Sequence, residues 1–363
     1  MIITLESGAN VDELMQAVGR NLERHPGVTP RLYQFEGTAH RVSEIHLVGD
    51  TKQIPVEPLS ALPGVRSVVR VSRKYRLIGR PPGSHEPAGF EYNGVRLDDQ
   101  TLTVFAGLCA VDTREHVAAM FRALAQHGIT TTRMGVYKPR TSPYDFQGLG
   151  RDCLPWLLEL AGENGIRVIA MEVCDVRHVE EVRTAMERAG NPTGVLLQVG
   201  TRNAQNFELL KQLGQQRDFP VLFKRGMGIT LEESLNACEY IASEGNPNIV
   251  FCLRGVKSHL SEPHRNMVDF ALVPVVRRLT RLPVCVDPSH SVGNLHRGPD
   301  DLPDIFHVTG QGVIAGATMV LVEFHPNPAA ARCDAHQALV LDQLPQLMRY
   351  VERVRAAYED VRP

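Results

Sequence analysis

From residue 101 onward, short apolar runs alternate with longer stretches whose apolar residues recur at the spacing of a helix face. Segments such as VAAMFRALAQHG and LEESLNACEYIASEG are predicted helices. The apolar runs between such segments are predicted strands: TLTVFAG, TTTRMG, RVIAMEV, VLLQVG, PVLFKRG, NIVFCLRG, PVCVDPSH and ATMVLVEFHP. Eight strands that alternate with helices predict an α/β fold, a (β/α)8 TIM barrel over residues 101–363. A doubly wound open sheet is the alternative, but no GxGxxG motif follows the first strand.

The first 80 residues follow a different pattern. Leu14, Val18 and Leu22 mark one face of a helix, and a second helix is expected near Pro58–Leu62. Four strand candidates surround these helices: IITLE, RLYQFEG, SEIHLVGD and VRSVVRVS. The order βαββαβ predicts a small ferredoxin-like α+β domain over residues 1–80. The proline- and glycine-rich segment GRPPGSHEPAGFEYNG then breaks the pattern, so residues 81–100 are expected to form a linker and a hairpin at the bottom of the barrel.

Composition narrows the functional class. The chain is 43% hydrophobic and 22% charged, with a formal net charge of −2. It therefore has no positive electrostatic field that would attract nucleic acid or an anionic membrane. Its seven cysteines are scattered and never spaced as CxxC, which argues against a disulfide framework or a zinc knuckle. The start MIITLESGANVDEL has acidic residues where a signal peptide has basic ones, and no apolar run approaches the roughly 20 residues of a membrane span. We expect a cytoplasmic protein.

Active sites of TIM barrels collect at the C-terminal ends of the strands, and nearly every predicted strand here ends in a charged residue or a possible metal ligand. These residues are Cys109, Arg133 with Lys138 and Arg140, Glu172, Arg202, Lys224 with Arg225, Arg254, Asp287 with His290, and Glu323 with His325. The cations among them suit two phosphates, or a phosphate and a carboxylate, since arginine offers a planar fork and lysine a point charge. A ring of salt bridges between strands is the alternative, with Glu172 as the obvious acidic counterweight.

The segment RMGVYKPRTSPYDFQGLG, residues 133–150, is the most distinctive of these strand ends. Two prolines and two glycines after residue 138 make a helix unfavourable, so Lys138, Arg140 and Thr141 are predicted on a loop. There their donors can converge on a phosphate group. The loop therefore favours phosphorylated substrates.

A second set of strand-end residues combines a thiol, an imidazole and two carboxylates: Cys109, His290, Glu323 and the later Asp334. These are ligands for a divalent transition metal. Taken singly, Cys109 could be a small buried apolar residue, His290 a hydrogen-bonding loop residue, and Asp334 the N-cap of the last helix. Spacing alone does not decide between these interpretations.

Longer motifs carry a specific resemblance. KPRTSPYDFQGLG (138–150), GTRNAQNFELL (200–210), LFKRGMGITLEE (222–233), VDPSHSVG (286–293) and VEFHPNP followed by Asp334 resemble the 3-deoxy-D-arabino-heptulosonate-7-phosphate (DAHP) synthases of type I-beta. The resemblance covers nearly the whole chain. VVRVSRKYRLIGR, residues 68–80, looks like the end of the ferredoxin-like regulatory extension of some members.

The resemblance implies a site and a reaction. A divalent metal would be held by Cys109, His290, Glu323 and Asp334, with Mn²⁺ expected first and Fe²⁺, Co²⁺ or Zn²⁺ also acceptable. Phosphoenolpyruvate would be bound by Arg133, Lys138, Arg202, Lys224 and Arg254. The phosphate of erythrose 4-phosphate would be bound by Arg140, Thr141 and Ser142. The reaction joins the two substrates and releases phosphate, the first committed step toward shikimate and the aromatic amino acids. Lys138 is our hypothesis for the proton donor, and Cys109 and His290 would act through the metal.

The chain departs from the family's motifs at three places: Leu108 replaces a proline, Leu253 replaces an acid, and the loop at 294–312 lacks the usual basic run. These departures leave two alternatives open, a paralogue that uses another aldehyde and a catalytically silent ligand-binding regulator. KPRT instead of KANR argues against the octulosonate relative that uses arabinose 5-phosphate.

The resemblance also implies how the N-terminal extension acts. It would bind Tyr or Phe for feedback control and pair between subunits, as in a homodimer or homotetramer. Simple oligomerisation or solubility is the alternative.

Overall fold

The computed structural model describes residues 1–36, 41–70, 75–81, 83–84 and 87–362. The chain forms two compact units, Met1–His85 and Glu86–Pro363. Each unit has a hydrophobic core of its own and is described by itself. Among the described residues, no helix is long and apolar enough to cross a membrane.

The N-terminal unit has the predicted ferredoxin-like fold. Its elements run in the order β1 (Ile2–Leu5), α1 (Val11–Leu22), β2 (Thr29–Glu36), β3 (Arg41–Val48), α2 (Glu57–Ser60) and β4 (Val65–Val69). The strands form one antiparallel sheet in the order β2-β3-β1-β4. Asn10 caps α1 by accepting a hydrogen bond from the Glu13 amide, and Leu14, Val18 and Leu22 are buried as predicted. The last two residues of the predicted strand VRSVVRVS lie outside the described residues.

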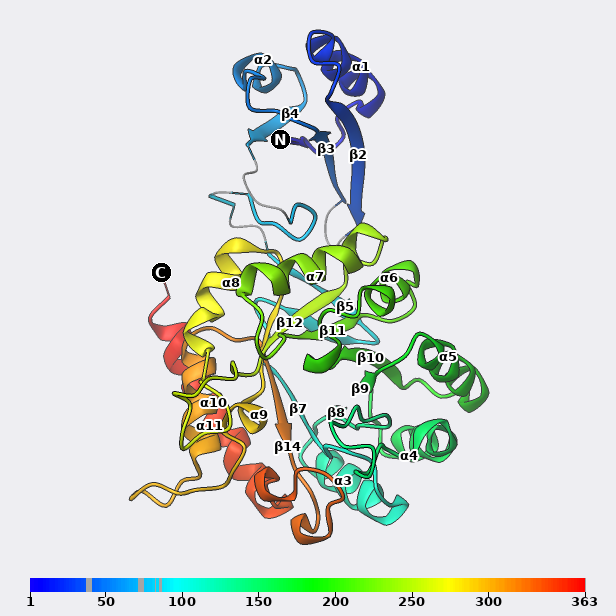
Figure 1. The fold of residues 1–363 in the computed structure, drawn as a ribbon, viewed down its shortest axis with the longest axis vertical. Coiled ribbons are helices and arrows are strands. Elements are labelled where there is room, and N and C mark those ends of the chain that lie inside the picture. Colours follow the sequence, from blue (N-terminus) through cyan, green and yellow to red (C-terminus); the bar gives the residue numbers. More distant parts are fainter. Residues whose placement is uncertain (37–40, 71–74, 82, 85–86, 363) are drawn as a thin grey trace. The chain divides into compact units, whose positions relative to one another are not determined.

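The second unit is a closed barrel of parallel strands surrounded by helices, and it confirms the predicted TIM barrel (Figure 1). The strands are β7 (Thr103–Gly107), β8 (Thr131–Arg133), β9 (Val168–Val173), β10 (Gly194–Val199), β11 (Val221–Lys224), β12 (Ile249–Leu253), β13 (Val284–Val286) and β14 (Met319–Glu323). Each strand corresponds to one of the apolar runs that were predicted as strands from the sequence. β9 and β10 are buried at every position, because strands of a parallel barrel are covered on both faces.

The helices of this unit are α3 (Arg114–Gln126), α4 (Leu154–Glu163), α5 (Arg177–Ala189), α6 (Phe207–Gln215), α7 (Leu231–Ser243), α8 (Val273–Leu279), α9 (Pro288–Val292), α10 (Asp304–Ile314) and α11 (Leu344–Asp360). Short 3₁₀ turns lie at Gly150–Cys153, Thr201–Asn203, Phe270–Leu272, Pro328–Ala330, Ala335–Gln337 and Leu341–Gln343. α7 begins with a capping box, in which the Thr230 side chain accepts a hydrogen bond from the Glu233 amide and the Glu233 side chain accepts one from the Thr230 amide. The cap fixes the end of the loop that follows β11.

The expectation of a loop over residues 294–312 is wrong in its second half. Residues Asp304–Ile314 form α10, whose residues Ile305, Phe306 and Val313 are buried. Glycines obscured the helical pattern, because Gly312 reads as a helix breaker. In the fold it permits close packing, since a Cβ at this position would lie 2.8 Å from the Val286 side chain.

A hairpin of β5 (Gly89–Tyr92) and β6 (Val95–Asp98) packs against the interior of the barrel. Val95 and Leu97 join the cluster formed by inward residues of the barrel strands, including Phe105 and Leu196. The hydroxyl of Tyr92 accepts a hydrogen bond from the amide of Val195, near the start of β10. The hairpin therefore lies at the N-terminal end of the barrel, and a substrate has to enter at the opposite end.

Candidate active site

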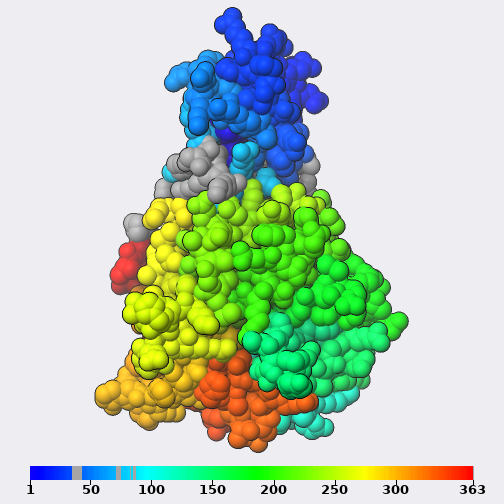
Figure 2. All heavy atoms as spheres, viewed as in Figure 1, coloured from blue at the N-terminus to red at the C-terminus, as the bar shows by residue number. Residues whose placement is uncertain are grey.

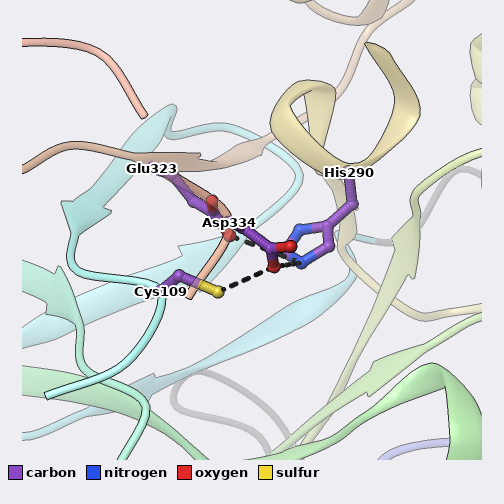
Figure 3. Close-up of side chains that lie close together, drawn as sticks. All are labelled: Cys109, His290, Glu323 and Asp334. Atoms are coloured by element: carbon purple, nitrogen blue, oxygen red, sulfur yellow. Dashed lines mark hydrogen bonds and ion pairs between the residues drawn. The ribbon is translucent and has the colours of Figure 1, made fainter. Parts of the chain in front are cut away.

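Four side chains that could bind a metal converge at the C-terminal end of the barrel (Figure 3). Cys109 follows β7, His290 lies on α9 directly after β13, Glu323 ends β14, and Asp334 lies on the segment after β14. Their ligand atoms all lie within 4.8 Å of one another. Cys109 Sγ is 3.2 Å from Asp334 Oδ2, and His290 Nε2 is 3.3 Å from Glu323 Oε1 and 3.8 Å from Asp334 Oδ2. The fold thus brings together the four residues predicted as metal ligands.

The hydrogen bonds of His290 define which of its nitrogens faces this cluster. Nδ1 is 2.9 Å from Oδ2 of the fully buried Asp287, an oxygen that also accepts a hydrogen bond from Lys224. Nδ1 therefore carries the proton and donates it to the carboxylate. Burial lowers the pKa of His290 below its ordinary value, so the ring is neutral and Nε2 presents a lone pair. The Nε2 lone pair, two carboxylates and a thiol thus face one another. Together they form a set of electron-pair donors that fits a cation.

The two carboxylates of the cluster are held from outside. Glu323 Oε1 accepts a hydrogen bond from Arg133 Nη1 at 2.9 Å, and Oε2 accepts one from Gln337 Nε2 at 2.8 Å.

Asp334 has a left-handed backbone with φ of 52°, which is uncommon for a residue other than glycine. It does not cap the last helix, because α11 begins at Leu344. Strain of this kind persists where the surroundings enforce it, and it is typical of functional positions.

A cleft beside the cluster is lined mainly by cations. The lining cations are Arg133, Lys138, Arg140, Arg202, Lys224, Arg254 and Arg265, and the lining acids are Asp145, Glu172 and Asp334. All five residues predicted for phosphoenolpyruvate line this cleft, together with His290 of the metal-ligand cluster. Arg225 does not line it, and its guanidinium instead pairs with Asp269 at 2.8 Å.

Three of the buried cations that line the cleft have carboxylate partners, so the salt-bridge interpretation is partly right. Arg133 pairs with Glu323, Lys224 with Asp287, and Lys138 Nζ lies 3.1 Å from Glu172 Oε2. Glu172 is therefore not the only acidic counterweight, since Asp287 and Glu323 also serve. These pairs hold the cations in place at the C-terminal end of the barrel. Lys138 and Glu172 belong to the adjacent strand ends of β8 and β9, whereas the other two pairs each reach across one intervening strand.

Arg254 differs from these cations. Its side chain is 1% exposed, and its Nη1 donates only to the carbonyl of the adjacent Gly255, at 3.3 Å. Its Nε has no hydrogen-bond partner among the described residues, and no carboxylate among them forms an ion pair with it. Burial lowers the pKa of Arg254 below its ordinary value. A buried, unpaired guanidinium at a cleft is costly unless an anion binds there.

The loop predicted to hold phosphate lies at the mouth of the cleft. Arg140 Nη1 donates to Cys333 Sγ at 2.8 Å, and Thr141 Oγ1 lies 3.5 Å from Arg202 Nη2. Gly148 has φ of 93°, and a Cβ there would lie 2.0 Å from the Val136 carbonyl, so the loop requires glycine. Ser142 does not line the cleft, and its hydroxyl accepts a hydrogen bond from the Tyr144 amide instead.

The same loop packs against the segment that carries Asp334. The Arg332 guanidinium lies 3.7 Å from the centre of the Phe146 ring, and Phe146 also packs against Cys109 and Cys333. Figure 2 shows the two segments as adjacent teal and orange surfaces. The loop and the metal-ligand cluster are therefore neighbours on one end of the barrel.

The two leucines that depart from the family's motifs do not line the cleft. Leu108 and Leu253 are both fully buried. Cys252 packs inside the barrel, so the next residue, Leu253, points to the opposite face of the strand, toward the helices. Neither leucine therefore changes the set of side chains that line the cleft.

Sequence reasoning missed several residues of the site. Arg265 lines the cleft and donates to Asp334 Oδ1 at 3.4 Å, Gln337 holds Glu323, and Cys333 lies beside Cys109. Arg265 lies on an irregular segment and Gln337 ends a short 3₁₀ turn, and neither stretch has a periodic apolar pattern. Their place after β12 and β14 was the available signal, because every loop after a barrel strand can reach the site.

A second group of possible ligands, Asp112, His116 and His325, lies close by. His325 Nδ1 accepts the amide hydrogen of Asn327 at 3.0 Å, so Nε2 carries the ring proton and donates it to Asp112 Oδ2 at 2.9 Å. Asp112 Oδ1 lies 3.1 Å from His116 Nδ1 and accepts the Thr113 amide at 2.7 Å. A metal on Nε2 would move the ring proton to Nδ1, against the Asn327 amide. This group is a satisfied hydrogen-bond network.

Comparison with known proteins agrees with this geometry. The model of the DAHP synthetase I family matches residues 88–359. The chain is 33% identical over 361 residues to the phospho-2-dehydro-3-deoxyheptonate aldolase of Thermotoga maritima, an alignment that covers 98% of each protein. It is 26% identical over 277 residues to the 2-dehydro-3-deoxyphosphooctonate aldolase of Geobacter sulfurreducens, covering 71% of this chain and 94% of that protein.

Solved structures give the same result. The crystal structure of the DAHP synthase of Thermotoga maritima matches with a TM-score of 0.71 at 32% identity, over 98% of this chain and 97% of that chain. A truncated form of that synthase matches with a TM-score of 0.63 at 30% identity, over 74% of this chain and 92% of that chain. The chain belongs to the DAHP synthetase I family.

Proposed function

We propose that this protein condenses phosphoenolpyruvate with erythrose 4-phosphate to give DAHP and phosphate, the first step of the shikimate pathway. Membership of the family supports this activity, as does the full-length similarity to a phospho-2-dehydro-3-deoxyheptonate aldolase. The observation that carries the proposal is the convergence of a metal-ligand cluster and an unpaired buried guanidinium on one cleft. Such a cleft suits an anionic substrate that reacts beside a metal.

We propose that Cys109, His290, Glu323 and Asp334 hold one divalent metal, as the family implies. The donor set of one thiol, one imidazole and two carboxylates accepts Mn²⁺, our first choice, and also Fe²⁺, Co²⁺ or Zn²⁺. When bound, the metal supplies Lewis acidity that makes the aldehyde carbonyl more electrophilic. Asp287, Arg133 and Gln337 orient the ligands from outside, as supporting residues of metal sites usually do.

Phosphoenolpyruvate is assigned to the buried cations. Arg254 offers a guanidinium fork for a phosphate or carboxylate, and Arg202, Lys224, Arg133 and Lys138 add positive charge around it. Arg140 and Thr141 at the mouth of the cleft are assigned to the phosphate of the aldehyde, with Ser142 shaping their loop. Two anionic substrates repel each other, and the cationic lining offsets that repulsion while it aligns the reacting carbons.

Bond formation follows from this placement. C3 of phosphoenolpyruvate attacks the aldehyde carbon, water adds to C2, and the resulting hemiketal phosphate loses inorganic phosphate. The alkoxide that forms on the aldehyde oxygen needs a proton. Lys138 is the proposed donor, because its ammonium group is buried in the cleft and lies 3.1 Å from Glu172 Oε2. Burial alone would lower its pKa, but the negative charge around it, that of Glu172 included, outweighs burial and raises the pKa, so the group carries a proton. A Lys138→Met enzyme with full turnover would remove this role.

The test is phosphoenolpyruvate consumption by the Mn²⁺-loaded protein with erythrose 4-phosphate, arabinose 5-phosphate or no aldehyde. We expect rapid turnover with erythrose 4-phosphate, little with arabinose 5-phosphate, and loss of both after chelation. If the protein consumed phosphoenolpyruvate with another aldehyde but not with erythrose 4-phosphate, that aldehyde would take the place of the proposed acceptor. Metal binding without any phosphoenolpyruvate consumption would favour a ligand-binding regulator.

For the N-terminal unit we propose feedback control by Tyr or Phe, in a cytoplasmic homo-oligomer that is a dimer or a tetramer. The support is its ferredoxin-like fold and the overall similarity to a synthase of the same length. We expect inhibition by one of these amino acids, and the loss of that inhibition when residues 1–80 are deleted. An intact enzyme that responds to neither amino acid would contradict the proposal.

A further inference from the structure

Cys333 lies beside the metal-ligand cluster, although it is not one of the four residues assigned to the metal. Its Sγ is 3.6 Å from Cys109 Sγ and 3.5 Å from Asp334 Oδ2. Cys109 Sγ and Asp334 Oδ2 are themselves 3.2 Å apart. The side chain is buried, and its thiol forms no disulfide. Two sulfurs and one carboxylate oxygen thus form a compact triangle.

The sides of this triangle match the spacing of ligands around one metal ion. Five ligands around one ion leave angles of roughly 90–120° between neighbours, so with bonds of about 2.3 Å to sulfur and about 2.1 Å to oxygen, two sulfurs lie about 3.3–4.0 Å apart, and a sulfur and an oxygen about 3.1–3.8 Å apart. The observed separations fall within these ranges. A metal bound by Cys109 and Asp334 is therefore within reach of Cys333 after a small adjustment.

We propose that Cys333 is a further ligand of this metal, binding beside Cys109 and Asp334. The inference rests on the metal centre proposed above and extends its ligand set. The Cys333 sulfur is close to the ligand atoms of Cys109 and Asp334, but it is not part of the group of ligand atoms that all lie within 4.8 Å of one another. It would therefore bind the metal from the side of Cys109 and Asp334. His290 and Glu323 complete the opposite side.

A second sulfur changes which metal the site prefers. Thiolates favour softer ions such as Zn²⁺ over Mn²⁺, whose preferred ligands are oxygens. A second thiolate also adds negative charge, and Arg140 Nη1 already lies 2.8 Å from the Cys333 sulfur to balance it. Arg140 is the cation assigned to the aldehyde phosphate, so the metal ligand and the substrate loop share one contact.

The alternative is that Cys333 only accepts the hydrogen bond from Arg140. Co²⁺ spectroscopy on the full-length chain separates the two interpretations, because each sulfur bound to Co²⁺ contributes to a charge-transfer band in the near ultraviolet. The metal-free protein is loaded with one equivalent of Co²⁺ as wild type, Cys333→Ser, Cys109→Ser and the double variant. Cys174→Ser is the matched control, since Cys174 is a half-buried cysteine that does not line the cleft.

We expect the charge-transfer intensity to fall about twofold in each single variant, to disappear in the double variant, and to stay unchanged in Cys174→Ser. In competition titrations, Cys333→Ser should lower the preference for Zn²⁺ over Mn²⁺ by about tenfold, within the range typical for residues that support a metal. Full intensity in Cys333→Ser would overturn this inference and leave the proposed function intact. A wild-type chain that binds no Co²⁺ would overturn the metal centre itself and this inference with it.

Discussion

Two histidine–aspartate pairs at the same end of the barrel have nearly the same geometry and opposite chemistry. His290 pairs with Asp287, and His325 pairs with Asp112, each at 2.9 Å. In the first pair Nδ1 faces the carboxylate, and Nε2 presents its lone pair to Glu323 and Asp334. In the second pair Nε2 faces the carboxylate, and Nδ1 accepts the amide hydrogen of Asn327. The Asn327 N–H group occupies the lone pair of His325, whereas the lone pair of His290 stays available for a metal. This one backbone hydrogen bond therefore distinguishes the structural histidine from the possible metal ligand.

The two clusters meet at the end of strand β14. Glu323, its last residue, belongs to the metal-ligand cluster, and His325, two residues later, belongs to the other. Likewise, Cys109 and Asp112 lie three residues apart after β7. The Asp112–His325 hydrogen bond therefore joins the two segments that carry Cys109 and Glu323. Substitutions in one cluster should affect metal binding, and substitutions in the other should affect stability.

The largest contrast is expected between His290→Ala and His325→Ala. His290→Ala removes a ligand, and metal catalysis of this kind contributes several kcal/mol, so turnover should fall by about 10³-fold and the protein should lose its metal. His325→Ala should retain one metal per chain, because its ring has no lone pair available for one. Metal content after dialysis, measured beside turnover, checks both variants. A His290→Ala protein that keeps its metal would contradict the assignment of Nε2 as a ligand.

A smaller effect is expected when the orientation of His290 is changed and the ring is kept. Asp287→Asn replaces the carboxylate by an amide that can donate to Nδ1, which would place the proton on Nε2 and remove its lone pair. Metal affinity should fall about 10- to 100-fold, as for other residues that orient metal ligands. Asp112→Asn is the matched control, and its affinity should not change. Competition with a metal-binding indicator measures both, and equal losses would show that burial rather than orientation matters.

The four residues of the metal-ligand cluster could be grouped from the sequence because a TIM barrel collects strand ends at one place, whatever their separation along the chain. Their assignment to a metal came from the family resemblance, because spacing alone did not decide it. Cys109 and Asp334 are 225 residues apart, yet both follow strands that pair, β7 and β14. The cationic lining was predictable for the same reason. The fold class followed from the apolar runs alone.

Pairing and orientation within the site could not be predicted in this way. Lys224 and Asp287 form a pair although they lie at the ends of β11 and β13, which β12 separates. Which cation pairs with a carboxylate, and that Arg254 pairs with none among the described residues, depends on side-chain positions. The opposite tautomers of His290 and His325 depend on single hydrogen bonds. α10 was missed because Gly312 reads as a helix breaker until the packing against Val286 is known.

Within the second cluster, Asp112→Ala should mainly affect stability. It leaves the buried Nε2–H of His325 without its acceptor, which costs about 1–3 kcal/mol. Burial would raise the pKa of Asp112, but the hydrogen bonds from His325 and His116 outweigh it and hold the pKa below its ordinary value of 3.8. The stabilisation is therefore fully present above about pH 4 and is lost as the pH falls through the lower folded-state pKa. Urea unfolding of wild type and variant between pH 3 and pH 7 measures this, and a difference that does not shrink in acid would contradict it.

The smallest effect is expected for His116→Gln. His116 contacts the other oxygen of Asp112, but its side chain is 23% exposed, whereas that of His325 is 3% exposed. Water can replace a partner at an exposed position, and glutamine keeps a donor, so the loss should be about 0.5 kcal/mol or less. His127→Gln, an exposed histidine just after the same helix, is the control. A loss as large as that of Asp112→Ala would mean that His116 and His325 hold Asp112 jointly, and that the network depends on both rings rather than on the buried one.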